Sequence, residues 1–198
     1  MKKLLAVAAL FVCSLWLASP AAANDIVSNG GFETGDFTGW TLSDGGALSG
    51  VFYGVDNFDA NSGDFGAALG YVSSTFTLSQ TLTTLPGETL VVSFAVAEDL
   101  RGGDGSEIGS NNTFVVTLNG QTLLTLDNPT TNVGNWAIYT FELNATAGSE
   151  VLAFTSENDM DFWSLDDVSV LAPEPGALYL LGTGLLGLAG IYRRRILG

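Results

Sequence analysis

Polar and apolar residues alternate in short runs through the middle of the chain, and clusters of glycine, asparagine and aspartate separate the runs. Residues 75–82 show the alternation that is typical of a strand with one face in solvent. No helical periodicity of useful length occurs between residues 24 and 172. The pattern predicts nine strands, at residues 51–53, 67–72, 76–82, 89–97, 113–118, 121–126, 137–143, 151–156 and 162–171.

Two dipeptides mark turns between the predicted strands. Asn119-Gly120 separates two of the runs, which is a strong signal for a two-residue hairpin turn. Pro86-Gly87 marks a second turn. Eight or nine short strands joined by regular turns are typical of a sandwich or jelly roll. We therefore expect an all-β, jelly-roll β-sandwich over residues 24–172, flanked by an N-terminal signal peptide and a C-terminal transmembrane helix.

The first 23 residues have the three parts of a secretory signal peptide. Two lysines follow Met1, an apolar stretch runs over residues 4–17, and small residues close the segment at Ala23. The apolar stretch is shorter than the roughly 20 residues that a spanning helix needs. We expect cleavage after Ala23, and an uncleaved N-terminal membrane anchor is the alternative.

The last 26 residues form a tail with three parts. Pro-Glu-Pro at residues 173–175 is followed by an uncharged, mostly apolar segment over residues 176–192, and three arginines come next. A segment of this length is at the lower limit for a membrane-spanning helix. Arginines stay on the cytoplasmic side of the membrane, so we expect the rest of the chain to face outward. A permanent single-span anchor is the alternative reading.

This tail resembles the PEP-CTERM sorting signal. The residues that carry the resemblance, apart from the apolar segment, are Pro173, Glu174, Pro175, Arg193, Arg194 and Arg195. The resemblance implies that exosortase, a membrane protease-transpeptidase of bacteria that make exopolysaccharide, recognises and removes the tail. It further implies export across the inner membrane to the cell surface or beyond, with a transient anchor whose C-terminus is cytoplasmic.

The segment between the two ends is strongly acidic. Of the 21 acidic residues only Glu174 lies outside residues 24–172, and of the 6 basic residues only Arg101 lies inside, which leaves 20 negative and 1 positive charges, a net of −19. This charge disfavours nucleic acid and anionic lipid headgroups as partners. It attracts cations such as calcium.

Residue types exclude most catalytic chemistry. The chain has no histidine, and its one cysteine, Cys13, lies in the expected signal peptide. This excludes Ser-His-Asp triads, cysteine nucleophiles in the exported protein and histidine-based metal sites. A carboxylate pair could hydrolyse glycosides, but 20 acidic residues will place some pair at almost any separation. We therefore expect a protein that is not an enzyme.

Two motifs at the ends of the central segment resemble the galactose-binding-domain-like jelly roll, a superfamily that includes many carbohydrate-binding modules. The first is Asn-Gly-Gly-Phe-Glu at residues 29–33 with Gly-Trp at 39–40, and the second is Leu-Asp-Asp-Val-Ser at 165–169. The resemblance implies a structural calcium, with Glu33 and Asp166 as ligands and Ser28 and Asp167 as weaker candidates. Strand alternation would put Asp166 and Asp167 on opposite faces. The alternative is that Glu33 caps a turn and Asp166 ends a ladder.

Aromatic residues raise the question of sugar binding. Exposed aromatic rings stack on pyranoses, and we consider Tyr53, Phe58, Tyr71 and Trp163 as such platforms. Trp40 and Trp136 are expected in the core. The acidic stretches at residues 56–64 and 98–107 are expected to be solvated loops, although loops on a rigid scaffold often carry function.

Two classes of function fit these observations. The first is an exported module that binds exopolysaccharide or a surface glycan, with calcium as a structural ion. The second is a structural or adhesive surface protein without a specific ligand. Exposed aromatic residues beside an acidic loop would favour the first, and a smooth Thr/Ser/Asn surface with buried aromatic residues would favour the second.

Overall fold

The computed structural model describes residues 23–43, 51–71, 75–98, 112–128, 134–158, 162–173, 184, 186 and 187. The expected signal peptide apart from Ala23, the tail from Glu174 through Pro175 to Arg193–Arg195, and all but three residues of the expected transmembrane helix lie outside this part. Within it, no helix is long and apolar enough to cross a membrane. Contacts divide the chain into two units, Asp25–Ala172 and the two chain ends together.

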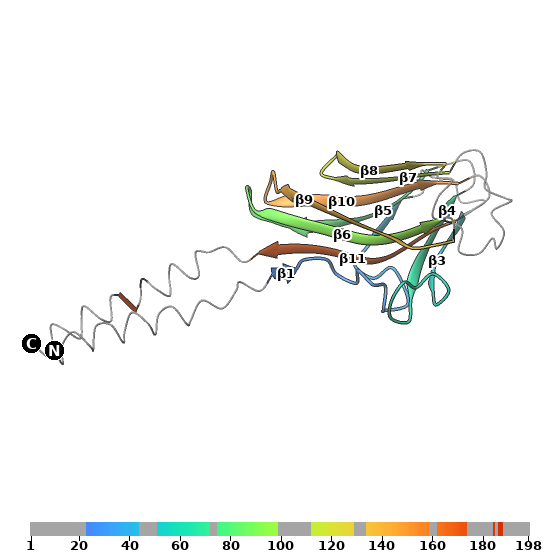
Figure 1. Ribbon diagram of the computed structural model, residues 1–198, viewed down its shortest axis with the longest axis horizontal. Helices are drawn as coiled ribbons and strands as arrows, with labels where there is room; N and C mark the ends of the chain where they lie inside the picture. Colours follow the sequence, from blue (N-terminus) through green and yellow to red (C-terminus); the bar gives the residue numbers. More distant parts are fainter. Residues whose placement is uncertain are drawn as a thin grey trace, which may run out of the picture. The chain divides into compact units, whose positions relative to one another are not determined.

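The described residues of the unit Asp25–Ala172 form strands and the turns and loops that join them (Figure 1). The strands are β1 (Ala23–Asp25), β2 (Thr41–Ser43), β3 (Val51–Asp56), β4 (Gly66–Tyr71), β5 (Thr75–Thr83), β6 (Thr89–Glu98), β7 (Thr113–Leu118), β8 (Gln121–Asp127), β9 (Ala137–Asn144), β10 (Ser149–Glu157) and β11 (Trp163–Pro173).

The strands form two antiparallel sheets that face each other across the core (Figure 1). Sheet A has the order β3-β4-β11-β6-β9, and β1 pairs with β11. Sheet B has the order β2-β5-β10-β7-β8. The first and last strands of the domain are thus neighbours, and the amide of Ile26 donates to the carbonyl of Val170 at 3.0 Å just beyond β1. The expected all-β sandwich is confirmed.

All nine predicted strands are present, with ends that differ by a few residues. The Asn119-Gly120 hairpin joins β7 to β8, and both residues have positive φ, 49° and 81°, as a type I′ turn requires. β1 and β2 were not predicted. Each is three residues long with every side chain exposed, so neither has a hydrophobic alternation to detect.

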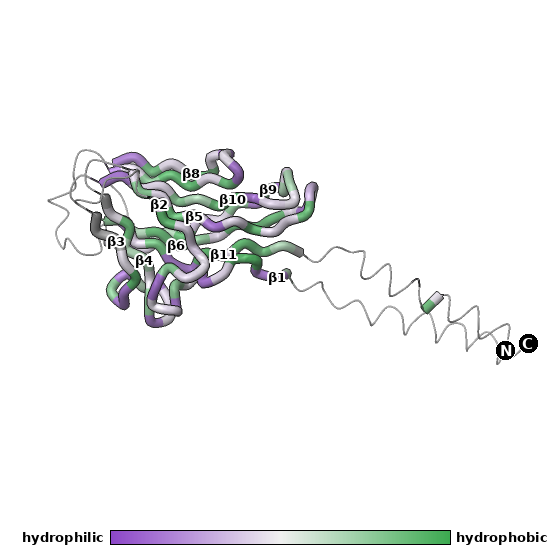
Figure 2. Tube along the Cα trace, turned by 180° about the vertical axis from the view of Figure 1, so that it is seen from behind, coloured by the Kyte–Doolittle hydropathy of each residue, from purple (hydrophilic) through white to green (hydrophobic). Residues whose placement is uncertain are grey.

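The inward-facing residues of both sheets form one apolar core. Burial alternates along β10, where Leu152 and Phe154 are fully buried. The ring of Phe154 lies 5.3 Å from Phe94, 6.0 Å from Trp40 and 6.1 Å from Phe114, centroid to centroid. Figure 2 shows apolar residues concentrated along the strands and hydrophilic residues at turns. This rigid core supports the loops that follow.

Candidate functional site

The motif at residues 29–40 folds into a compact turn around one asparagine. Asn29 has φ 52°, and its side-chain amide donates to the carbonyls of Asp36 and Thr38 at 3.0 Å each. Its own carbonyl accepts the indole N–H of Trp40 at 3.0 Å. Trp40 is buried, as expected. The turn therefore has a fixed shape, and it leaves Glu33 on the surface.

Glu33 holds the backbone of the loop between β3 and β4. Its carboxylate accepts the amide of Asp64 at 3.0 Å and that of Phe65 at 3.2 Å. At Gly63 φ is +66°, which favours glycine, and an added Cβ would lie 2.1 Å from a Glu33 oxygen, so the carboxylate would have to move. Glu33 thus fixes one end of this loop.

Asp166 and Asp167 hold the middle of the same loop. Asp166 Oδ2 accepts the amides of Asn61 and Ser62 at 2.7 and 3.0 Å. The Asp167 carboxylate accepts the Asn61 side-chain amide and the Ser62 hydroxyl, each at 2.6 Å. Both carboxylates therefore point to the same loop, and the expectation that strand alternation puts them on opposite faces is wrong. Asp167 has φ 51°, and the β11–β6 register shifts between Asp166 and Ser169, so a bulge turns both carboxylates to one loop.

The start of the loop covers the outer face of sheet A. The hydroxyl of Ser164 on β11 donates to Asp59 at 2.5 Å, and both side chains are buried. At Gly66 an added Cβ would lie 1.7 Å from the Asp59 carbonyl oxygen. The backbones at residues 59 and 66 are therefore too close together for any residue larger than glycine at position 66. We call residues 57–65 the clamped loop. Its residues are mostly exposed or half-buried, as expected for a solvated loop, and Asp59 is the buried exception. The second acidic stretch lies outside the described residues beyond Glu98.

Burial has the largest effect on the pKa of Asp166, which holds the clamped loop. Burial raises the pKa of Asp166 above its ordinary value, and the neighbouring Asp167 charge adds to this rise. Amide hydrogen bonds from Ser62, Asp167 and Asn61 favour the charged form and oppose the rise without cancelling it. The amides of the loop thus replace water around a carboxylate that burial would otherwise leave poorly solvated.

The expected calcium ligands are not gathered as a metal centre. Among the described residues, no three acidic side chains group to hold a metal ion. The carboxylates of Glu33, Asp166 and Asp167 accept hydrogen bonds from N–H or O–H groups of the loop. The other oxygen of Asp166 accepts the backbone amide of Asp167. The backbone of Ser28 pairs instead with the Gln80 side chain, at 2.8 and 2.9 Å. As placed, this donor set does not fit calcium, and calcium binding stays a prediction of the resemblance.

The four candidate aromatic platforms have different surroundings. Phe58, on the clamped loop, is 54% exposed. Trp163 is 1% exposed and lies 5.2 Å from the Phe114 ring, so its expected role as a platform needs correction: it is a core residue. Tyr53 and Tyr71 lie on β3 and β4, and their side chains are outside the described part.

Sequence reasoning missed a groove beside β5. It has a volume of about 400 Å³ and carries no charged residue, and its lining residues are Ile26, Ser28, Gly39, Gln80, Thr81 and Thr83. β2 pairs with β5 only at residues 77–79, which leaves the strand edge beyond them open to the groove. Its lining comes from three separate segments, so no local pattern could have predicted it.

Solved structures share this fold. A carbohydrate-binding module, TmCBM61, in complex with β-1,4-galactotriose has a TM-score of 0.57 and 19% identity, over 75% of this chain and 99% of that chain. The CBM22-1 xylan-binding domain of Paenibacillus barcinonensis Xyn10C has a TM-score of 0.53 and 19% identity, over 79% and 99%. The K3 adhesin domain of Lys-gingipain from Porphyromonas gingivalis has a TM-score of 0.54 and 19% identity, over 76% and 99%. No family model and no curated protein matches the sequence. At these identities the similarity shows a shared jelly-roll fold.

Proposed function

We propose that the domain is a non-enzymatic module that binds a carbohydrate outside the cell, with Phe58 as a stacking platform. The observation that carries this is an exposed aromatic ring on a clamped loop. Because hydrogen bonds already hold the backbone of this loop, the loop loses little conformational entropy when a sugar stacks on the ring. The shared fold with carbohydrate-binding modules supports the same proposal.

Charge narrows the class of glycan. The segment 24–172 carries a net charge of −19, which repels polysaccharides that contain uronate or sulfate groups. The groove beside β5 adds hydroxyl and amide groups without charge. We therefore favour a neutral exopolysaccharide or surface glycan as the ligand.

The variant Phe58→Ala tests the platform. Loss of a stacking ring should raise the dissociation constant for the bound glycan by about tenfold, because an aromatic contact of about 0.5–1.5 kcal/mol and its buried area are both lost. The measurement is isothermal titration of the full chain with neutral polysaccharides, including galactan and xylan, and with polygalacturonate as the anionic comparison.

Leu85→Ala is the matched control, because Leu85 is 53% exposed and Phe58 is 54% exposed. Truncation at Leu85 should leave affinity unchanged. If both variants bind as well as the unaltered chain, the stacking role is excluded and the groove beside β5 becomes the better location. If a folded chain binds none of the glycans, the binding function itself is excluded.

The second candidate function is a structural or adhesive surface protein without a specific ligand. The outer face of sheet B favours it, because threonine and serine dominate that face on β5. Thr77 and Thr155 pair there through their hydroxyl groups at 3.0 Å. Half of the aromatic side chains that the structure describes are buried, and Phe58 alone of this described set is exposed rather than half-buried or buried. Phe58 is therefore the feature that decides between the two candidates.

We also propose that the chain is exported and that exosortase removes its tail, on the basis of the ordered signals at residues 1–23 and 173–198. In an exosortase-producing host, mass spectrometry of the surface protein should find a chain that begins at Asn24 and has lost residues 176–198. Replacing Pro173 and Pro175 by alanine should leave the tail attached. An intact tail on the unaltered surface protein would contradict the proposal and favour a permanent anchor.

A further inference from the structure

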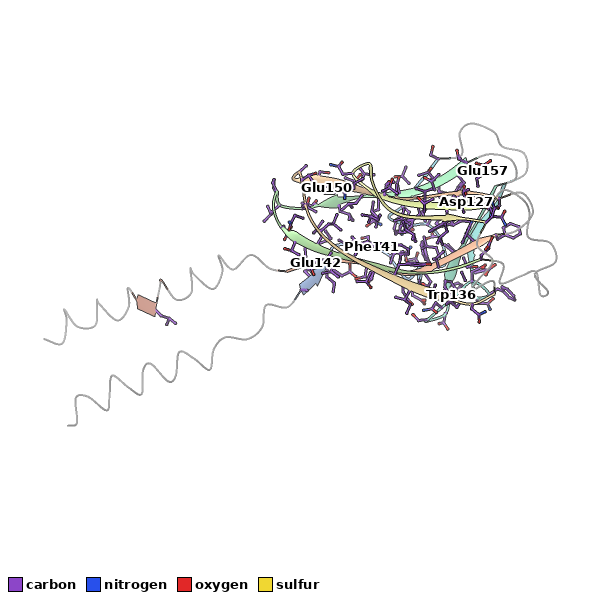
Figure 3. The ribbon with its side chains drawn as sticks, turned by 45° about the horizontal axis from the view of Figure 1, so that its top comes forward. Asp127, Trp136, Phe141, Glu142, Glu150 and Glu157 are labelled. Carbon is purple, nitrogen blue, oxygen red and sulfur yellow. The ribbon has the colours of Figure 1, made fainter. Side chains whose placement is uncertain are left out.

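The edge of β5 that lines the groove is only partly paired. β2 pairs with β5 at residues 77–79, and among the described residues no strand continues this pairing at Thr81 and Thr83. β5 ends beside the first residues of β10. Figure 3 marks this end of the sandwich with Glu150 and the other end of β10 with Glu157. A short stretch of sheet B therefore has an open edge at this end.

Two hydrogen bonds show which way the backbone groups of this stretch point. The amide of Thr84 donates to the carbonyl of Gly148 at 3.2 Å, on the β10 side. The carbonyl of Val151, which is opposite Thr81, accepts an amide from the β7–β8 turn at 2.8 Å, on the side away from β5. Backbone groups alternate between the two sides of an antiparallel strand. Those of Thr81 and Thr83 therefore point away from β10, toward the groove that both residues line.

The opposite wall of the groove is a stretch of backbone that two hydrogen bonds hold in place. The amide of Ser28 donates to Gln80 Oε1 at 2.8 Å, and Gln80 Nε2 donates to the Ser28 carbonyl at 2.9 Å. Gln80 is 7% exposed, so both hydrogen bonds are shielded from water. The segment at Ser28 cannot close over the edge of β5 without breaking them.

The groove has room for a short extended chain. A residue in a β-sheet takes up about 4.8 Å between strands, 3.3 Å along the strand and 10 Å between packed layers, or roughly 160 Å³. The groove volume of about 400 Å³ therefore admits about two to three residues, which matches the length of the open edge. None of the described residues that line it is aromatic, so a sugar ring would find no stacking surface there.

We propose that the open edge of β5 binds an extended segment of a different protein, which adds a short strand to sheet B. The main chain of the partner pairs with the backbone groups of Thr81 and Thr83. β5 has no proline, lysine or bulge that would protect this edge. The net charge of −19 in residues 24–172 repels a second copy and favours a neutral or basic partner. This binding is independent of the glycan platform at Phe58.

Amide hydrogen exchange of the full chain, followed by NMR, tests the open edge first. In the free chain the amides of Thr81 and Thr83 should exchange faster than the amide of Leu82, which points toward β10. The probe is a blocked peptide that alternates threonine and valine and has a lysine at each end. It should slow exchange at Thr81 and Thr83 and shift their NMR signals. Equal protection of all three amides in the free chain would show that the edge is already paired, and would overturn the proposal.

Thr83→Pro removes one N–H group from the groove and no hydrogen bond to β10. It should raise the dissociation constant of the peptide by about tenfold, because a hydrogen bond is lost and its acceptor on the peptide is left unpaired. Thr75→Pro is the matched control, since it makes the same change at the first residue of β5, outside the groove. This control should bind the peptide as well as the unaltered chain does.

A probe that is N-methylated at alternate residues keeps its charge and loses main-chain donors. It should not bind, and it keeps the test valid if Thr83→Pro does not fold. Peptide binding that survives both changes would overturn the proposal, and so would a folded, unaltered chain that does not bind the peptide. If galactotriose shifts the Thr81 and Thr83 signals instead, the groove is a glycan site and the proposal is wrong. Self-association that Thr83→Pro abolishes would also overturn it, because the occupant would then be a second copy.

Discussion

Phe154→Ala should lower the free energy of unfolding by about 3–5 kcal/mol, which is the range for truncating a fully buried phenylalanine. Phe154 is 0% exposed and contacts the rings of Trp40, Phe94 and Phe114 from both sheets. The lost stability has two parts. Less apolar surface is buried, and the surrounding strands cannot move in to fill the cavity that the ring leaves. Because domains are stable by about 5–15 kcal/mol, the effect is a large share of the total. Urea unfolding followed by tryptophan fluorescence measures it.

Val151→Ala on the same strand is the control for Phe154→Ala. Val151 is 41% exposed, so its truncation should change stability by less than about 0.5 kcal/mol. If Phe154→Ala does not fold, Phe154→Leu gives a smaller loss in the same direction. Equal losses for Phe154→Ala and Val151→Ala would mean that the two sheets do not pack through this ring.

Asp166→Asn should lower the free energy of unfolding by about 2–4 kcal/mol, because buried hydrogen bonds to a charged group are lost and donors are left unpaired. The asparagine has one acceptor oxygen, and its NH₂ group would face the amides of Asn61 and Ser62 or of Asp167. The clamped loop should loosen first. Urea unfolding and limited proteolysis within residues 57–65, both with a chelator present, measure the two effects.

Glu142→Gln is the matched control for Asp166→Asn, since it removes a charge from an exposed position on β9. Its stability and its rate of proteolysis should stay near those of the unaltered chain. If Asp166→Asn behaves in the same way as Glu142→Gln, the carboxylate does not anchor the loop. The proposal that a hydrogen-bonded loop holds Phe58 ready to stack on a sugar would then lose its support.

The strands could be predicted because alternation is a local property. β5 and β7 bury every second residue, and the sequence shows this period directly. The hairpin at Asn119-Gly120 could be predicted because its positive φ angles select those residue types. β1 and β2 escaped prediction because pairing with β11 and β5, and no pattern of their own, makes them strands.

The site could be predicted only in part. Glu33, Asp166 and Asp167 were singled out, and they do converge on one loop. Their partners are loop amides, which local sequence does not reveal because the partners of Asp166 lie 104 and 105 residues away. Trp163 was misplaced for a related reason, since alternation does not say which face of β11 meets the other sheet.

The sequence by itself determined the strand pattern, the acidic charge of the domain and the exclusion of histidine and cysteine chemistry. These depend on residue type and local spacing, which are present before the chain folds. Tertiary structure decided which carboxylates clamp the loop, that a bulge turns Asp166 and Asp167 together, and that Phe58 is exposed while Trp163 is buried. Each of these depends on packing between segments far apart in the chain, where burial and hydrogen-bond partners are set by the whole fold.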